Sequence, residues 1–301
     1  MNAPEFGKPP SLGLDAAGDV ASASSGWHAR LDLAFAERGN ATIPVVRSHR
    51  GPLRVQKGFT PEGPGLWHQV VVHPPGGIAS GDQLAMAIDA REGARALMTS
   101  PGAAKWYRAN AEAVDRRAWQ SISLSVADRA SLEWLPLETI VFDGAVADWR
   151  TRIDLQGSGS VIAADLVCLG RPASDLRFAS GEIRSQLEIT RDGRLIFFEQ
   201  AHIEGDSPIL SAQAGLAGLP AFATMVIASN TGGHSVIIER IRALHEQLPG
   251  DWAVSALPGL VVLRWRGPGA EAGWRVLRAA WAACRPIVIG REACPPRIWA
   301  T

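Results

Sequence analysis

The chain has 301 residues, of which 47% are hydrophobic and 20% are charged, and its 30 basic residues balance its 30 acidic residues. This length allows a sizeable core in one large domain or two ordinary ones, and the balanced charge argues against nucleic acid or an anionic membrane as a partner. The three cysteines, Cys168, Cys284 and Cys294, are widely spaced without a CxxC motif, which supports neither a disulfide framework nor a zinc site and fits a reducing compartment.

The first 25 residues differ in composition from the rest of the chain. Residues 1–25 are rich in Pro, Gly, Ala and Ser, and they lack the basic and apolar regions of a signal peptide. We predict a disordered tail there, followed by a single domain over residues 26–301. No stretch approaches the roughly 20 apolar residues that span a bilayer, so we expect a soluble, cytoplasmic protein.

From residue 26 to about residue 215 the dominant hydrophobic period is two. Leu31, Leu33 and Phe35 alternate with small or polar residues, and the same alternation recurs in residues 84–89 and 182–189. This pattern is typical of half-buried strands, with one face packed inward and the other facing water or a polar layer. We therefore predict a mainly β body over this part of the chain.

Four similar turns separate these runs. They lie at residues 91–94, 127–130, 156–160 and 191–194, and an apolar run follows each. A strand–turn–strand unit that recurs every 30 to 36 residues or so favours stacked strands, either as layered sheets or as an irregular β-solenoid. Four unrelated hairpins in a β-sandwich explain the periodicity about as well.

The pattern changes over residues 216–301, where we predict an α+β part with two helices. A buried strand at residues 223–228 ends in a turn at residues 230–233, and apolar residues then follow at helical spacing up to Leu248. Two further strands flank a Pro-Gly turn. A second amphipathic helix contains Trp274, Leu277, Trp281 and Cys284, and Pro286 is expected to end it.

The sequence HPPGGIASGD, residues 73–82, forms a rigid segment that we call the glycine elbow. Its prolines remove backbone donors and its glycines permit positive φ, so a ligand or another chain segment can approach closely. One interpretation is a small-molecule enzyme that uses His73 and Asp82, which requires an apolar pocket with convergent polar groups. A structural turn is favoured over a phosphate loop, because a strand rather than a helix follows.

Three carboxylates, Asp82, Asp165 and Glu199, adjoin apolar runs or the elbow. A buried carboxylate costs several kcal/mol unless it is paired or hydrated. Each therefore needs an arginine, backbone donors or a water-filled passage, and for each one alone an ion pair or a turn cap is the commoner explanation. No nucleophile–base motif and no histidine pair at metal-ligand spacing accompanies them.

Six blocks in chain order carry a further signal. They are GPLRVQKGFTPEG at residues 51–63, HPPGGIASGD at 73–82, SPGAAKWYR at 100–108, LEWLPLETIVFDGA at 132–145, DLVCLGRP at 165–172 and PRIW at 296–299. In this order they resemble the signatures of the UreD (also called UreH) urease accessory proteins. The resemblance covers nearly the whole chain from about residue 26. A single PPGG motif would be weak evidence for this family, whereas six blocks in the family's order are highly specific to it.

The resemblance implies a scaffold rather than a catalyst, with no tightly bound cofactor. Members of this family bind apo-urease and, with the helical accessory protein UreF and the GTPase UreG, form the complex that inserts nickel into the enzyme. The implied fold is two layers of helically stacked β-strands, irregular and β-helix-like, with two helices near the C-terminus. Family members are also thought to contain an internal water-filled passage.

Within this framework two sets of residues acquire expected roles. We expect the carboxylates to line a passage as hard oxygen ligands for a nickel ion in transit, and these are Asp82, Asp165 and Glu199. We expect exposed aromatic and basic groups to contact the partner proteins, and these are Trp106, Arg108, Arg297 and Trp299.

Overall fold

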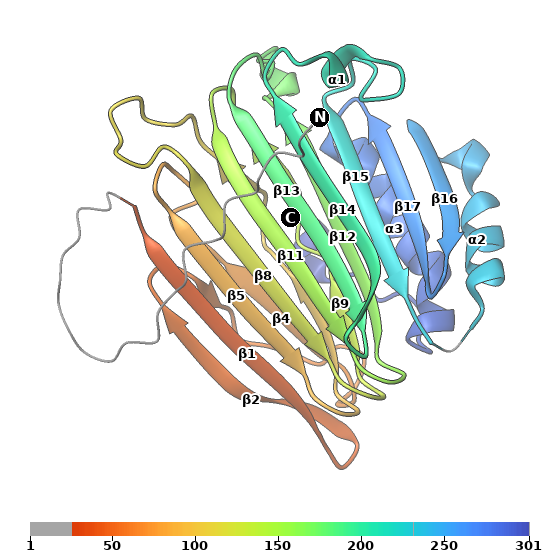
Figure 1. Cartoon of the computed structure of the whole chain (residues 1–301). Coiled ribbons are helices and arrows are strands. Elements are labelled where there is room, and N and C mark those ends of the chain that lie inside the picture. The colour runs from red at the N-terminus through yellow and green to blue at the C-terminus, as the bar shows by residue number, and fades with distance from the viewer. Residues whose placement is uncertain (1–25, 231, 301) are drawn as a thin grey trace.

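The computed structural model describes residues 26–230 and 232–300, so the predicted tail lies outside the described residues. Two β-sheets lie face to face, and helices α2 and α3 cover the outer face of one of them (Figure 1). The predicted mainly β class is confirmed.

The first sheet has seven strands. Its order is β14 (Arg194–Glu204), β13 (Glu182–Arg191), β11 (Val146–Leu155), β8 (Ala118–Val126), β5 (Gln83–Ala90), β1 (His28–Arg38) and β2 (Ala41–Arg50). The five central strands run parallel to one another, and the two edge strands are antiparallel to their neighbours.

The second sheet is longer. Its main path is β16 (Asp251–Leu257), β17 (Leu260–Gly267), β15 (Ala221–Ala228), β12 (Ser160–Leu169), β9 (Ser131–Trp134), β6 (Arg95–Thr99), β4 (Trp67–Val72) and β3 (Arg54–Val55). Two short strands leave this path, with β10 (Thr139–Val141) pairing β12 and β7 (Ala104–Trp106) pairing β10. The strands β4, β6, β9 and β12 are parallel, as their counterparts in the first sheet are.

Three of the four predicted turns carry the chain from the first sheet to the second. They connect β5 to β6, β8 to β9 and β11 to β12. Successive turns also bond to one another, because Gly93 N–H donates to the Asp128 carbonyl at 3.2 Å and Ser158 N–H donates to Asp128 Oδ1 at 2.7 Å. The helically stacked, two-layer arrangement is therefore confirmed, and four unrelated hairpins are excluded.

The fourth turn differs, because it joins β13 and β14 as an antiparallel hairpin within the first sheet. Asp192 and Gly193 both have positive φ, at 49° and 74°. A two-residue loop of this kind matches the twist of paired antiparallel strands. The stacking of parallel strands in the first sheet therefore ends at β13.

The second sheet is buried on both faces. Val161, Ala163 and Val167 of β12 pack between the sheets, whereas Ile162 and Leu166 pack beneath the helices. A strand buried on both sides reads as a nearly continuous apolar run. This explains why β12 is apolar along almost its whole length, whereas the first-sheet strands alternate.

The two predicted C-terminal helices are present as α2 (His234–Arg242) and α3 (Ala270–Val288). The apolar residues at helical spacing extend to Leu248, beyond the end of α2, because a separate 3₁₀ turn, His245–Gln247, follows this helix. A single helical turn, α1 (Pro208–Ser211), and two more 3₁₀ turns, Pro172–Ser174 and Arg297–Ala300, were not predicted. None of the helices in the described residues is long and apolar enough to cross a bilayer.

The prediction that Pro286 ends the second helix is wrong, because α3 continues to Val288. Proline removes one backbone donor, but residues on both sides of it remain packed against the sheet. Arg285 and Val288 are buried, and Ile289 N–H donates to the Arg285 carbonyl at 2.8 Å. Burial therefore outweighs the lost hydrogen bond.

Candidate functional site

A cavity of about 400 Å³ lies between the two sheets. On the second sheet its lining passes across neighbouring strands from β4 to β15, through Val72, Thr99, Trp134, Asp165 and Thr224. On the first sheet five lining residues share one register row from β5 to β14, namely Met86, Ile122, Thr151, Leu187 and Glu199. The cavity therefore extends across the strands, from the glycine elbow after β4 towards β14 and β15. Its walls are mostly apolar, so its few polar groups determine what it can bind.

Asp165 of β12 is a carboxylate in the wall of this cavity. Protein surrounds it on all sides, yet the residue is open to the cavity instead of being packed. Burial raises the pKa of Asp165 from 3.8 to about 6; a hydrogen bond with the Trp149 side chain opposes this rise, and the charge of Glu199 adds to it. At neutral pH Asp165 is therefore mostly an ionised carboxylate held in an apolar wall.

Glu199 lies where the cavity approaches the edge of the sheets. Its Oε1 accepts a hydrogen bond from Thr224 Oγ1 at 3.3 Å, and its Oε2 forms an ion pair with Arg264 Nη2. Asp165, Thr224 and Arg264 are direct neighbours in the register of β12, β15 and β17. A polar row therefore leads from the deep carboxylate to an arginine at the surface.

Asp82 is not part of this cavity. Its two carboxylate oxygens accept hydrogen bonds from the backbone N–H groups of Trp27 at 2.7 Å and Ala79 at 2.8 Å, and the residue is buried. It therefore closes the glycine elbow and holds the start of β1 against it. The structure brings Asp165 and Glu199 to one cavity and leaves Asp82 outside as a turn cap.

His73 does line the cavity. Burial lowers the pKa of its imidazole, and the nearby charge of Asp82 opposes that shift. The apolar pocket that the small-molecule enzyme interpretation required is thus present beside the elbow. However, His73 Nε2 is buried without a hydrogen-bond partner, and the two oxygens of Asp82 accept backbone N–H groups of Trp27 and Ala79, so neither group shows the partner that a catalytic couple would need.

The expected exposure of the two tryptophans is wrong. Trp106 is only 2% exposed and packs against Trp149 with ring centroids 5.6 Å apart. Trp299 is 7% exposed, and its Nε1–H donates to Thr99 Oγ1 at 2.8 Å. Both tryptophans lie in short elements, Trp106 in β7 and Trp299 in the last 3₁₀ turn, where the sequence does not show whether a ring packs into the core or contacts a partner.

The two arginines of the same set are exposed. Arg297 lies in the last 3₁₀ turn, and Arg108 forms an ion pair with Asp143 at the surface. Their contact with partner proteins stays a prediction.

A family model described as "UreD urease accessory protein" matches residues 28–300. The chain belongs to the UreD family of urease accessory proteins. Curated relatives of the same name agree with this. One from Pseudomonas fluorescens is 47% identical over 275 residues, which cover 91% of this chain and 95% of the relative. One from Azoarcus sp. is 41% identical over 283 residues, which cover 93% and 96%.

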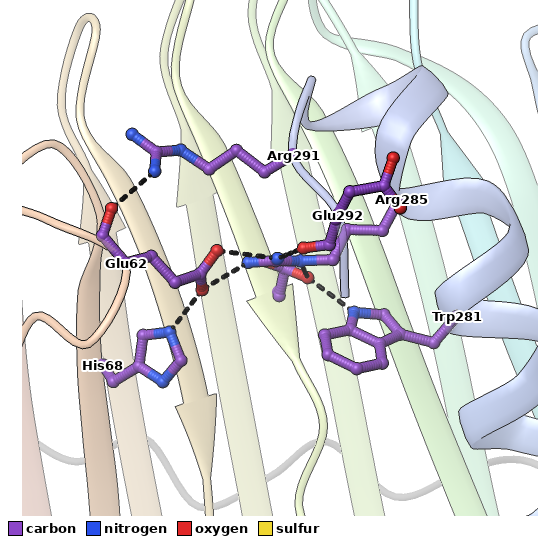
Figure 2. A network of polar contacts seen from close by, with 7 residues as sticks. Glu62, His68, Trp281, Arg285, Arg291 and Glu292 are labelled. Atoms are coloured by element: carbon purple, nitrogen blue, oxygen red, sulfur yellow. Dashed lines mark hydrogen bonds and ion pairs between the residues drawn. The ribbon is translucent and has the colours of Figure 1, made fainter. Parts of the chain in front are cut away.

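This UreD-family chain also contains a buried ionic cluster that the sequence did not reveal (Figure 2). Arg285 of α3 lies at its centre, with Nη2 2.7 Å from Glu62 Oε1 and Nε 2.9 Å from Glu133 Oε1. Trp281 Nε1–H donates to Glu133 Oε1 at 2.6 Å, and His68 Nε2 lies 2.7 Å from Glu62 Oε1. The cluster ties α3 to strands β4 and β9 and to the loop before β4.

The electrostatics of this cluster favour a structural role. Burial raises the pKa of Glu133, although Arg285 opposes the rise. At Glu62 burial acts in the same direction, but hydrogen bonds from Arg285 and His68 hold its pKa below the ordinary value. Glu133 and its cation Arg285 are 152 residues apart in the chain, so the sequence does not indicate the pair.

Within the described residues, no three His, Cys, Asp or Glu side chains come together in a way that would hold a metal ion. Asp165 and Glu199, with the Thr224 hydroxyl, offer two carboxylates and one neutral oxygen. These are hard oxygen donors, which suit a divalent ion. Because they are so few, the ion would be held weakly and would exchange.

Asp165→Asn should stabilise the protein, and more so at pH 8 than at pH 5. Because the folded state raises the pKa of Asp165 to about 6, it binds the proton more tightly than the unfolded chain, and stability is lost as pH rises through this range. The difference in pKa corresponds to about 3 kcal/mol, which we reduce to about 1–2 kcal/mol because the carboxylate faces an open cavity. Urea unfolding at the two pH values measures the gain.

The control for this measurement is Asp89→Asn, which removes an exposed carboxylate from the same protein. It should change the free energy of unfolding by less than about 0.5 kcal/mol at either pH. Equal stability of Asp165→Asn and wild type at pH 8 would contradict the raised pKa.

Proposed function

We propose that this protein is a urease maturation scaffold that carries nickel in transit through its inter-sheet cavity. A helical accessory protein of the UreF type and a GTPase of the UreG type are its proposed partners, and the GTPase rather than this chain hydrolyses GTP. Membership of the UreD family supports the urease role. The observation that carries the nickel role is the ionised Asp165 deep in the cavity, with Glu199 between it and the surface.

The geometry suits an ion that passes rather than one that stays. A permanent site needs several converging ligands, whereas this cavity offers two carboxylates and the Thr224 hydroxyl within mostly apolar walls. The ion gains charge stabilisation at Asp165 and again at Glu199, and neither position satisfies it fully. Nickel is therefore cargo in this proposal, and the protein needs no tightly bound cofactor.

Asp82 has no part in the proposed route. Its oxygens already accept two backbone hydrogen bonds, and giving them up would open the glycine elbow. Its contribution is indirect, since the elbow that it closes supplies His73 and Gly77 to the cavity lining.

Partner contacts are proposed at the exposed arginines, Arg108 and Arg297. Both side chains are exposed, whereas Trp106 and Trp299, which we also expected to contact partners, are buried. Arginine at an exposed position forms bidentate bonds with acidic groups and is enriched at protein interfaces.

The test is the nickel content of urease from cells that express the whole urease operon with or without this chain. We expect urease without it to contain little nickel and show little activity, and the wild-type chain to restore both only when the GTPase is active. In the same cells, tagged wild-type chain should recover apo-urease and the accessory proteins, and an Arg108→Ala, Arg297→Ala variant should recover less. Fully nickel-loaded urease in the absence of the chain would overturn the proposal.

A further inference from the structure

The outer end of the polar row is formed by Arg264 on β17. It faces the same side of the second sheet as Thr224 and Asp165, because the three are direct register neighbours. Its Nη2 reaches Glu199 Oε2, which belongs to the edge strand β14 of the opposite sheet. The arginine side chain is 58% exposed and that of Glu199 is 26% exposed. The ion pair therefore links the two sheets where the cavity meets the solvent.

The two oxygens of Glu199 are both engaged. Oε1 accepts from Thr224 and Oε2 faces the guanidinium, so a divalent cation that approaches Glu199 must take a position that Arg264 already occupies. Guanidinium does not lose its proton in proteins. Arg264 can therefore yield Glu199 only by moving, and its exposure leaves it room to swing into the solvent.

We propose that Arg264 is a gate residue, which competes with the metal ion for Glu199 at the mouth of the inter-sheet cavity. The proposal rests on the proposed nickel route, and adds that exchange of a cation between solvent and Asp165 requires displacement of this arginine. The arginine lowers the affinity of the mouth for divalent cations, while Asp165 behind it stays free to bind.

The test is Ni²⁺ binding to the purified full-length chain by equilibrium dialysis at pH 7.5. Arg264→Gln removes the competing charge, and an exposed ion pair corresponds to roughly two- to fivefold in a binding constant. We therefore expect the Kd of the variant to be about two to five times lower than that of wild type. Arg264→Lys keeps a charge without the planar fork and should lie between the two.

A matched control is available on the outer face of the first sheet. Arg152 is also 58% exposed and also pairs with a carboxylate, Asp154, so Arg152→Gln makes the same change of charge at the same exposure. It should leave the Kd unchanged. In the Glu199→Gln background, Arg264→Gln should no longer tighten binding, because the contested ligand is gone.

The outcomes separate the gate from the route. Equal Kd values for Arg264→Gln and wild type, together with weaker binding by Asp165→Asn and Glu199→Gln, would overturn the gate and keep the route. Unchanged binding by Arg264→Gln, Asp165→Asn and Glu199→Gln alike, or no binding by wild type, would count against both. A gain that persists without Glu199 would show that Arg264 acts through general charge, and would also overturn the gate.

Discussion

Replacing Arg285 with alanine should lower the free energy of unfolding by about 3–5 kcal/mol. The substitution leaves Glu133 buried without its cation, and it also removes the guanidinium from Glu62. An uncompensated buried charge costs far more than the ion pair contributes, because water cannot replace the missing partner. Urea unfolding at pH 7.5 measures the loss.

Two companion variants identify the origin of this loss. Arg152→Ala removes an exposed arginine from its ion pair and should cost less than about 1 kcal/mol. Adding Glu133→Gln to Arg285→Ala removes the stranded charge, so the double variant should recover part of the loss. If Arg285→Ala were no more destabilising than Arg152→Ala, the cluster would not be a structural element of the fold.

Many strands were predictable from the sequence, because residues of the first-sheet strands alternate and β15 forms a short apolar run. Their pairing was not, since a turn between two alternating runs looks alike in a hairpin and in a crossover between sheets. The turn at residues 191–194 shows this, because it resembles the three crossing turns and yet forms a hairpin. The recurring turns favoured stacked strands but fitted unrelated hairpins in a β-sandwich about as well, and the family resemblance added the helical stacking that the structure has.

The candidate site was predictable in part. Asp165 and Glu199 were noticeable because carboxylates rarely adjoin apolar runs. Asp82 matched the same criterion, but it caps a turn, and sequence does not show whether a carboxylate meets backbone N–H groups or a cavity. Arg264 and Arg285 gave no signal, because each acquires its role from a partner more than 60 residues away.

Asp165→Asn combined with Glu199→Gln should lower the rate at which urease acquires nickel by roughly tenfold or more, since removal of even indirect metal contacts costs 10- to 100-fold in affinity. Both substitutions keep the shape of the side chain and remove the charge that attracts the ion. The measurement is the nickel content and activity of urease from cells that produce each variant at wild-type level.

The loss can be separated from misfolding, because Asp165→Asn is expected to be more stable than wild type. Glu188→Gln is the matched control for Glu199→Gln, since Glu188 is also 26% exposed and lies on the neighbouring strand β13, on the outer face of the sheet. It should leave urease activation unchanged. Normal nickel content with the double variant would exclude a route past Asp165 and Glu199. Reduced nickel content from a fully stable scaffold would instead mean that the two carboxylates act on the ion rather than on the fold.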